Sequence, residues 1–261
     1  YAHNESDGYR SNAKSKRDNA SFISQFKISD KRQLTASILY NNLFYETPGG
    51  LTKTEFTANP KQARPAAGGF PSAAAAKAAI CQKNFTAGLN HQYNFNNDFK
   101  NILTLYGAFA QIKNPTFRNY ERRNEPGFGG RTFFIYEKKI NETAIQLVAG
   151  GELQEDFFNT QVSKNKNGNP DTLQTNDDIR YSTYSIFAQA DVSIKENWII
   201  TAGASINKSK VDFTRLSSYP VLEQNRIYKN QLSPRLALQK KINNHAVFVS
   251  ISKGFSPPTV S

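Results

Sequence analysis

The chain has 261 residues, of which 33 are Lys or Arg and 21 are Asp or Glu, giving a formal net charge of +12 with 38% hydrophobic residues. No stretch approaches the ~18 to 20 continuous apolar residues that a transmembrane helix needs. The basic residues are scattered through loops and turns, without a basic helix or an aromatic RNA-binding motif, so we expect no nucleic-acid partner.

Apolar and polar residues alternate with period two along much of the chain, which predicts about ten strands. They are expected at residues 18–33, 34–46, 83–95, 99–113, 131–140, 143–159, 179–194, 198–214, 229–241 and 244–253. In the best pair, 183–194 with 198–207, only Phe187 and Ile199 break the alternation. Strands of more than about ten residues suit a tilted membrane crossing better than a soluble sheet.

The predicted connections alternate in length. Tight turns fall at residues 29–31, 96–98, 140–142, 195–197 and 242–244, and long polar connections at 47–81, 114–129, 161–178 and 217–228. Residues 4–17 are expected to form another polar loop, and 72–80 a short helix capped by Ser72, because Ala is the best helix former. Short turns at one end, long loops at the other and aromatic residues beside the turns are typical of an outer-membrane β-barrel.

A soluble antiparallel sandwich also alternates apolar and polar residues, and it could bind carbohydrate through its aromatic side chains. A passive outer-membrane pore is a second alternative, in which the 47–81 loop would fold into the lumen. Strand length and the one-sided long loops favour a membrane barrel over the sandwich. In either barrel we expect one all-β antiparallel up-and-down meander, strongly twisted and curved, with unpaired edges at its first and last strands.

Four segments carry a family resemblance. The first has Tyr45-Glu46-Thr47-Pro48-Gly49-Gly50, then Asn59-Pro60, Arg64-Pro65 and an alanine run to Ile80; the others are Pro115–Glu121 with Gly129–Thr132, Leu232–Leu238, and Ser252–Thr259. In this order they resemble the barrel of TonB-dependent outer-membrane receptors of the ferric-siderophore and ferric-citrate type. The resemblance covers nearly the whole chain.

The resemblance implies a 22-stranded barrel plugged by an N-terminal domain. Such receptors bind a ferric siderophore or similar chelate outside the cell and import it with energy from the TonB complex. The chain has no Met and no signal peptide, so we expect residues 1–261 to be a single partial barrel domain without plug and TonB box. Such a slice alone would neither close nor transport, and its other partner would be outer-membrane lipid.

Five arginines lie on the predicted long-loop side, where guanidinium groups could grip an anionic chelate in bidentate fashion. They are Arg64, Arg118, Arg122, Arg123 and Arg131. The alternative is that each of them pairs with a carboxylate such as Glu46, Glu121 or Glu125, holds loops together, or touches lipid headgroups.

Signs of catalysis are missing from the sequence. His3, His91 and His245 are far apart, which gives no support to a metal triad or a Ser/His/Asp arrangement. Cys81 is alone, so it forms no internal disulfide and has no evident partner base. We therefore expect a transporter and not an enzyme, with no cofactor and no resident metal.

Overall fold

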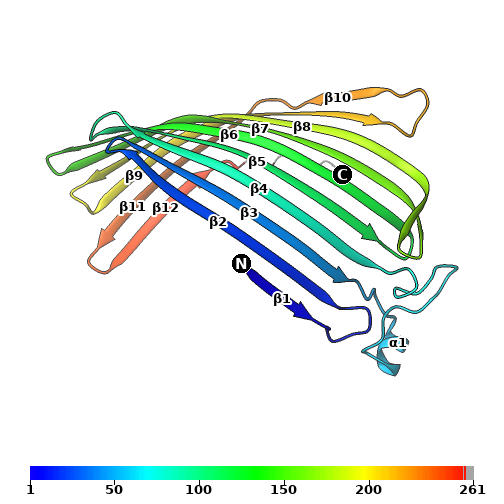
Figure 1. Ribbon diagram of the computed structural model, residues 1–261. Coiled ribbons are helices and arrows are strands. Elements are labelled where there is room, and N and C mark those ends of the chain that lie inside the picture. The colour runs from blue at the N-terminus through cyan, green and yellow to red at the C-terminus, as the bar shows by residue number, and fades with distance from the viewer. Residues whose placement is uncertain (255, 257–261) are drawn as a thin grey trace.

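The computed structural model describes residues 1–254 and 256, and one antiparallel sheet holds most of them (Figure 1). The strands are β1 (Ala2–Ser6), β2 (Ser15–Ser29), β3 (Arg32–Glu46), β4 (Ala79–Asn94), β5 (Phe99–Pro115), β6 (Asn119–Ile140), β7 (Thr143–Lys166), β8 (Asn169–Ile194), β9 (Trp198–Arg215), β10 (Glu223–Ile227), β11 (Gln231–Ile242) and β12 (His245–Ser252). One short helix, α1 (Lys53–Ala58), lies in the connection from β3 to β4.

The expected meander is confirmed. Strands pair in chain order from β1 to β9 and then through β11 to β12, while β10 pairs with β9. The sheet is strongly curved, and β1 and β12 stand at its open edges (Figure 1). All ten predicted strands are present among the described residues, and β1 and β10 are additional. Because β10 and β11 follow each other along the same edge of β9, they behave as one strand interrupted at residues 228–230.

Two of the predicted long connections are wrong. Strand β5 runs to Pro115 and β6 begins at Asn119, so a tight turn, in which the Thr116 amide donates to the Asn119 carbonyl at 2.7 Å, replaces the expected loop at 114–129. The expected loop at 161–178 is likewise a hairpin, turned by Asn167 and Gly168 with φ of 53° and 84°. These strand ends are polar on both faces, so the alternation that marks a strand is lost there.

Two local predictions are also wrong. Residues 4–17 are not one loop, because β1 pairs with the start of β2, from Ala2 opposite Asn19 to Ser6 opposite Ser15. Residues 72–80 form only one turn: the Ser72 hydroxyl accepts the Ala75 amide at 3.1 Å, and Lys77, with φ of 49°, ends the turn. The helix is instead α1, which starts with a capping box between Thr52 and Glu55.

The predicted tight turns are confirmed, and aromatic rings gather beside one of them. The turn from β4 to β5 lies between Asn94 and Phe99, and the ring centroid of Phe95 is 5.0 Å from that of Phe99. Phe134 joins this cluster at 5.7 Å from Phe99. Amphipathic and aromatic girdles at the ends of strands are typical of membrane barrels.

The two faces of the sheet differ in polarity. Ile186 and Ile206 are direct cross-strand neighbours and are 73% and 52% exposed. We call this apolar side, which also carries Phe85 and Phe109, the outer face. On the opposite, inner face, Gln189 donates to Asp191 at 2.7 Å and the Thr201 hydroxyl donates to the same carboxylate.

The part of the chain that the structure describes has almost no buried apolar core. Its buried hydrophobic residues are Ala73, Ala76, Ala78, Ala79, Ile112 and Tyr120. Because a soluble sandwich must bury one face of each sheet against the other, this single sheet with an exposed apolar face rules that alternative out. Among the same residues, no helix has the length and apolar character needed to cross a membrane.

The assignment of faces can be tested with two neighbouring substitutions in the full-length protein. Ala190→Lys places a charge in the middle of the outer face and should lower the free energy of unfolding in lipid vesicles by ~2 to 4 kcal/mol. Gln189→Lys, one residue away on the inner face, should fold like the unsubstituted protein. Equal stability of both variants would contradict a lipid-facing outer side.

Candidate functional site

The long connection from β3 to β4, residues 47–78, is an ordered loop fixed by side chains from two other hairpins. The Asn165 side-chain amide donates to the carbonyls of Ala76 at 2.8 Å and Thr116 at 2.6 Å. From the β1–β2 connection, the Asn12 amide donates to the carbonyls of Thr47 and Ala78 at 3.1 and 3.0 Å. We call residues 7–14, 47–78, 116–118 and 167–168 the loop cluster.

Arg64 and Arg118, two of the predicted ligand-binding residues, hold the loop cluster together. The Arg64 guanidinium donates to the carbonyls of Pro71 at 2.8 Å and Ala67 at 3.3 Å, and lies 4.0 Å from the centroid of the Phe117 ring. Arg118 is exposed and lies 5.2 Å from the Phe70 ring, which meets Phe117 edge-on. The structure therefore brings these two arginines to one aromatic cluster.

The motif residues at the start of this loop shape its first turn. Tyr45 and Glu46 end β3, and the Pro48 carbonyl accepts the Arg64 amide at 2.7 Å. Gly49 has φ of 74°, and a Cβ on it would lie 2.8 Å from the Cβ of Arg64. Gly50 has open space around its Cα. Further along, Asn59 caps the end of α1, Pro60 lies in the turn that follows it, and Pro65 lies later in the loop.

The remaining predicted arginines lie on β6, and they divide between the two faces. Arg123 is directly opposite Ile112 and Arg131 opposite Thr104, so both share the inner face with Thr104 and Tyr106. Arg122 is opposite Lys113 and faces outward. Arg122 therefore cannot join the other two, which corrects the predicted set. Successive side chains of a strand point to opposite faces, and the strand continues through the region that was expected to be a loop.

Arg123 forms ion pairs with two carboxylates. Its guanidinium lies 3.4 Å from Glu121 and 3.3 Å from Glu125, on either side of it along the same face of β6. The predicted alternative of carboxylate pairing is therefore what the structure shows for this residue. For a ligand to take over Arg123, it would have to displace two partly exposed ion pairs, which individually contribute little.

Arg131 stands between two aromatic rings on the inner face. Its guanidinium carbon is 4.9 Å from the centroid of Phe187 and 5.3 Å from that of Phe133. The nearest carboxylate, of Glu152, is 3.9 Å away, and about half of the Arg131 side chain is exposed. A planar cation held between rings with free donors can bind a carboxylate or phenolate in bidentate geometry.

Sequence reasoning missed the polar residues beside Arg131. Tyr106 donates to the Gln154 side-chain oxygen at 3.4 Å, and the Gln154 amide donates to Asp156 at 2.9 Å. Gly129 leaves room for the Tyr106 ring, since a Cβ there would meet the phenol oxygen at 2.3 Å. The run of glycines in β6 was the feature of the sequence that could have pointed to these residues.

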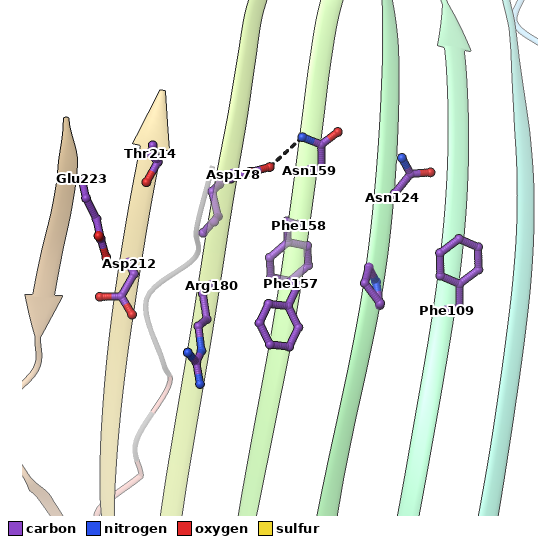
Figure 2. Close-up of a pocket in the computed structure, with 12 residues that line it drawn as sticks. Phe109, Asn124, Phe157, Phe158, Asn159, Asp178, Arg180, Asp212, Thr214 and Glu223 are labelled. Atoms are coloured by element: carbon purple, nitrogen blue, oxygen red, sulfur yellow. Dashed lines mark hydrogen bonds between the residues drawn. The ribbon is translucent and has the colours of Figure 1, made fainter. Parts of the chain in front are cut away.

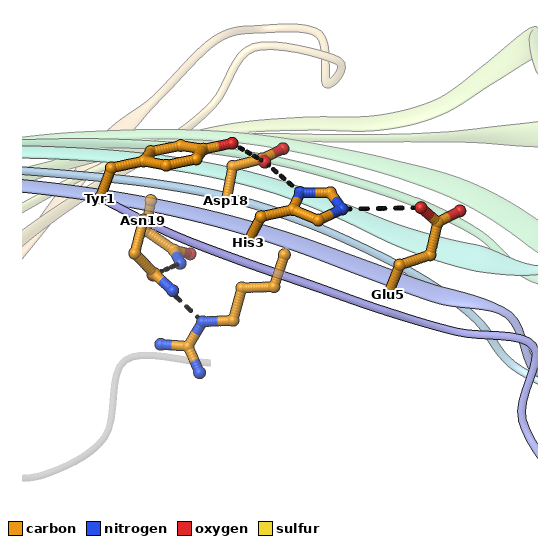
Figure 3. A network of polar contacts seen from close by, with 7 residues as sticks. Tyr1, His3, Glu5, Asp18 and Asn19 are labelled. Atoms are coloured by element: carbon orange, nitrogen blue, oxygen red, sulfur yellow. Dashed lines mark hydrogen bonds and ion pairs between the residues drawn. The ribbon is translucent and has the colours of Figure 1, made fainter.

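Two further polar features lie outside this inner wall. A groove of about 690 Å³ crosses β5 to β10 and is lined by side chains that include Phe157, Arg180 and Asp212 (Figure 2). At the β1 edge, Asp18 accepts a hydrogen bond from Tyr1 and contacts His3, both at 2.7 Å (Figure 3). These contacts lower the pKa of the Asp18 carboxyl, and the hydrogen bond with His3 has a larger effect than the one from Tyr1. Among the described residues, no group of three or more His, Cys, Asp or Glu side chains could hold a metal ion.

A family model described as "TonB dependent receptor-like, beta-barrel" matches residues 14–261. The chain belongs to this family. TonB-dependent receptor barrels lie in the outer membrane of Gram-negative bacteria, so the outer face contacts lipid and the inner face lines the lumen. The family consists of transport receptors. A comparison with curated protein sequences found no match.

Solved structures of receptors share the fold. The unliganded ferric citrate transporter FecA has a TM-score of 0.81 at 13% identity, over 92% of this chain and 36% of FecA. The open form of the ferric-catecholate import receptor Fiu from E. coli K12 has a TM-score of 0.76 at 10% sequence identity, over 98% of this chain and 49% of Fiu. The copper transporter OprC has a TM-score of 0.69 at 12% sequence identity, over 96% of this chain and 39% of OprC. The chain thus spans less than half the length of each of these receptors.

The fourth motif of the TonB-dependent receptor resemblance lies mostly outside the described residues. Ser252 ends β12, while Phe255 and residues 257–259 are not described. The third motif is β11, where Pro234 pairs with Ala204 and its carbonyl accepts the Lys253 amide at 3.0 Å.

The two glycines of the loop motif provide a matched test of the loop cluster. Gly49→Ala in the full-length receptor should loosen residues 47–78, because it combines a left-handed backbone, which costs a side chain about 1 to 2 kcal/mol, with a clash against Arg64. Gly50→Ala should leave the loop unchanged, since nothing lies within 4 Å of its added Cβ. Amide hydrogen exchange over residues 47–78 measures the difference, and equal protection in both variants would contradict the described packing.

Proposed function

We propose that this chain is part of the barrel of an outer-membrane receptor that takes up ferric siderophores or similar anionic iron chelates with energy from the TonB complex. Membership of the family supports the transport role, and the names of the ferric citrate and ferric-catecholate receptors support the substrate class. In this proposal, residues 1–261 are one partial barrel domain of a longer protein, and the plug and the TonB box lie elsewhere in it.

The observation that supports the substrate class is the environment of the Arg131 side chain. It faces the lumen, two aromatic rings flank its guanidinium, and the closest carboxylate among the described residues, that of Glu152, is at 3.9 Å. A half-exposed cation whose ion pair with Glu152 is this long keeps donors available for an anionic ligand, and the low dielectric of a lined cavity strengthens that contact. Phe133 and Phe187 would stack with an aromatic or planar part of the chelate.

Arg123 has the role of a second contact nearer the outside. It lies eight residues before Arg131 on the same strand and face, and at a rise of ~3.4 Å per residue this separation is roughly 27 Å. A ligand entering between the hairpins would pass Arg123 first, where the flanking Glu121 and Glu125 keep the local charge low. Arg64 and Arg118 would act indirectly, by shaping the loop cluster through which the ligand enters.

The proposal is tested by uptake of ⁵⁵Fe supplied as ferric citrate, a ferric catecholate and a ferric hydroxamate. The host lacks its own receptors for these chelates and expresses the full-length protein, with or without TonB. We expect uptake of at least one chelate, and its loss without TonB. Uptake that is independent of TonB would identify a passive pore, and uptake of none of the three would contradict the substrate class.

The role of Arg131 has its own test, on the chelate that is transported. Arg131→Gln should weaken chelate binding by about 10-fold to 100-fold, the loss expected for a charge-assisted hydrogen bond. Arg122→Gln removes the same charge from the opposite face of the same strand, so its affinity should stay unchanged. Binding is measured by quenching of intrinsic fluorescence on the purified receptor, and equal affinities of the two variants would remove Arg131 from the site.

A further inference from the structure

The inner wall contains a hollow of about 330 Å³ that crosses β4 to β7. It lies four residues along β6 from Arg131, on the side of the long hairpins. Ala108, Gly127 and Asp156 are direct neighbours across β5, β6 and β7, on the same face as Arg131. We call this feature the inner hollow, and the residues that line it from the inner face include Thr86, Ala108, Glu125, Gly127, Asp156 and Phe158.

The inner hollow lies where the ladder between β6 and β7 is interrupted. Pairing passes from Asn124 opposite Asn159 to Gly127 opposite Asp156, and within the described sheet the two positions of β6 in between have no ladder partner on β7. One of them is Pro126, which has no N–H to donate. Gly127 then leaves the wall without a side chain at the same level. A glycine inside a strand often marks a place where a ligand approaches the backbone closely.

Asp156 places one uncompensated carboxylate oxygen in the inner hollow. Its Oδ2 accepts the Gln154 side-chain amide at 2.9 Å. Its Oδ1 lies against the backbone of Gly127, since a Cβ built on that glycine would be 2.3 Å from this oxygen. Within residues 1–254 and 256, Asp156 takes part in no ion pair. Glu125, the other carboxylate of the lining, is instead 3.3 Å from the Arg123 guanidinium.

The lining of the inner hollow is suited to an ammonium group. A free carboxylate oxygen accepts a charge-assisted hydrogen bond from it, and the Phe158 ring attracts a cation through its face. The Thr86 hydroxyl offers a further acceptor. An anion would instead be repelled by Asp156. Ligand pockets usually have volumes of roughly 300 to 1,000 Å³, so this hollow fits one end of a larger ligand rather than the whole.

We propose that the inner hollow is a subsite for an ammonium group carried by the transported iron chelate, with Asp156 as its anionic contact. The proposal rests on the proposed function, in which Arg131 contacts the anionic oxygen donors of the chelate. Arg131 is directly opposite Glu152, and Asp156 follows four residues later on the same face of β7, which is about 14 Å at ~3.4 Å per residue. Two opposite charges at this spacing orient the chelate, with its iron-binding part at Arg131 and its amine towards the long hairpins. The substrate class is therefore an iron chelate with a free amine.

The test compares two forms of one ferric chelate, which end in a primary amine or in its N-acetyl amide. Both forms are made in a citrate, a catecholate and a hydroxamate series, and their affinities for the purified full-length receptor are measured by quenching of intrinsic fluorescence. In the series that is taken up, the amine form should bind about 10-fold to 100-fold more tightly than the acetylated form, the effect of a charge-assisted hydrogen bond. Asp156→Asn should abolish this preference.

Asp191→Asn is the matched control for the loss of a lumen carboxylate. Asp191 also faces inward and accepts a side-chain amide from the Gln two residues before it, at 2.7 Å. It lies ten residues along β8 from Tyr181, the residue opposite Asp156, which is roughly 34 Å away. The preference for the amine form should therefore persist in this variant.

A second pair of variants keeps every charge. Gly127→Ala should also abolish the preference, because its Cβ would displace the Asp156 carboxylate from the hollow. Gly107→Ala, on the neighbouring strand, should retain it, since the nearest atom to its added Cβ is 3.7 Å away. This pair decides the question if Asp156→Asn does not fold, as judged by heat-modifiable electrophoretic mobility.

The remaining outcomes overturn the ammonium subsite. Equal affinities of the two chelate forms for the unsubstituted receptor would show that no amine is recognised. A preference that survives in both Asp156→Asn and Gly127→Ala would place the amine elsewhere, and one that is also lost in Asp191→Asn would identify a general effect of lumen charge. In each of these cases TonB-dependent uptake leaves the proposed function standing, whereas uptake in none of the three series contradicts the proposed function itself.

Discussion

The antiparallel ladder of backbone hydrogen bonds is the constraint on which the rest of this structure depends. In a bilayer no water satisfies an unpaired amide or carbonyl, so every strand that crosses needs a neighbour on both sides. The ladder also fixes which way each side chain points, because the pleat sends alternate residues to opposite faces. One sheet can thus serve two environments, with Ile186 and Ile206 towards lipid and Gln189 and Asp191 towards the lumen.

The sequence predicts the fold where the two environments differ. Between the tight turns and the upper edge of the apolar belt, lipid on one side and polar surroundings on the other impose alternation, and all ten predicted strands are present there. Above the belt both faces meet water, so β6, β7 and β8 continue as polar hairpins that have no period of their own. The ladder persists because backbone pairing needs no apolar side chain, and cross-strand polar pairs such as Asn159 with Asp178 suffice.

The same loss of alternation explains which site residues were predictable. Arginines can be counted in a sequence. Assigning Arg122 and Arg123 to opposite faces, however, requires knowing that β6 begins at Asn119 and not at residue 131, where the predicted strand starts. The useful signal was instead a break in a well-formed strand: Phe187 is an apolar residue on the polar face of β8, and it stands 4.9 Å from Arg131. Residues that violate a local pattern without an evident structural gain are good candidates for function.

Charge compensation separates structural cations from available ones across this sheet. Arg123, Arg180 and Lys210 each meet a carboxylate that the chain itself provides, and Arg64 meets backbone carbonyls. Arg131 on the inner face and the pair of Lys113 and Arg122 on the outer face lack such close partners among the described residues. A protein gains no stability from leaving cations unneutralised, and from adjacent like charges it loses some. In the proposed function, Arg131 is explained by an anion that comes from the lumen, and the pleat decides that Arg131, and not Arg122, faces it.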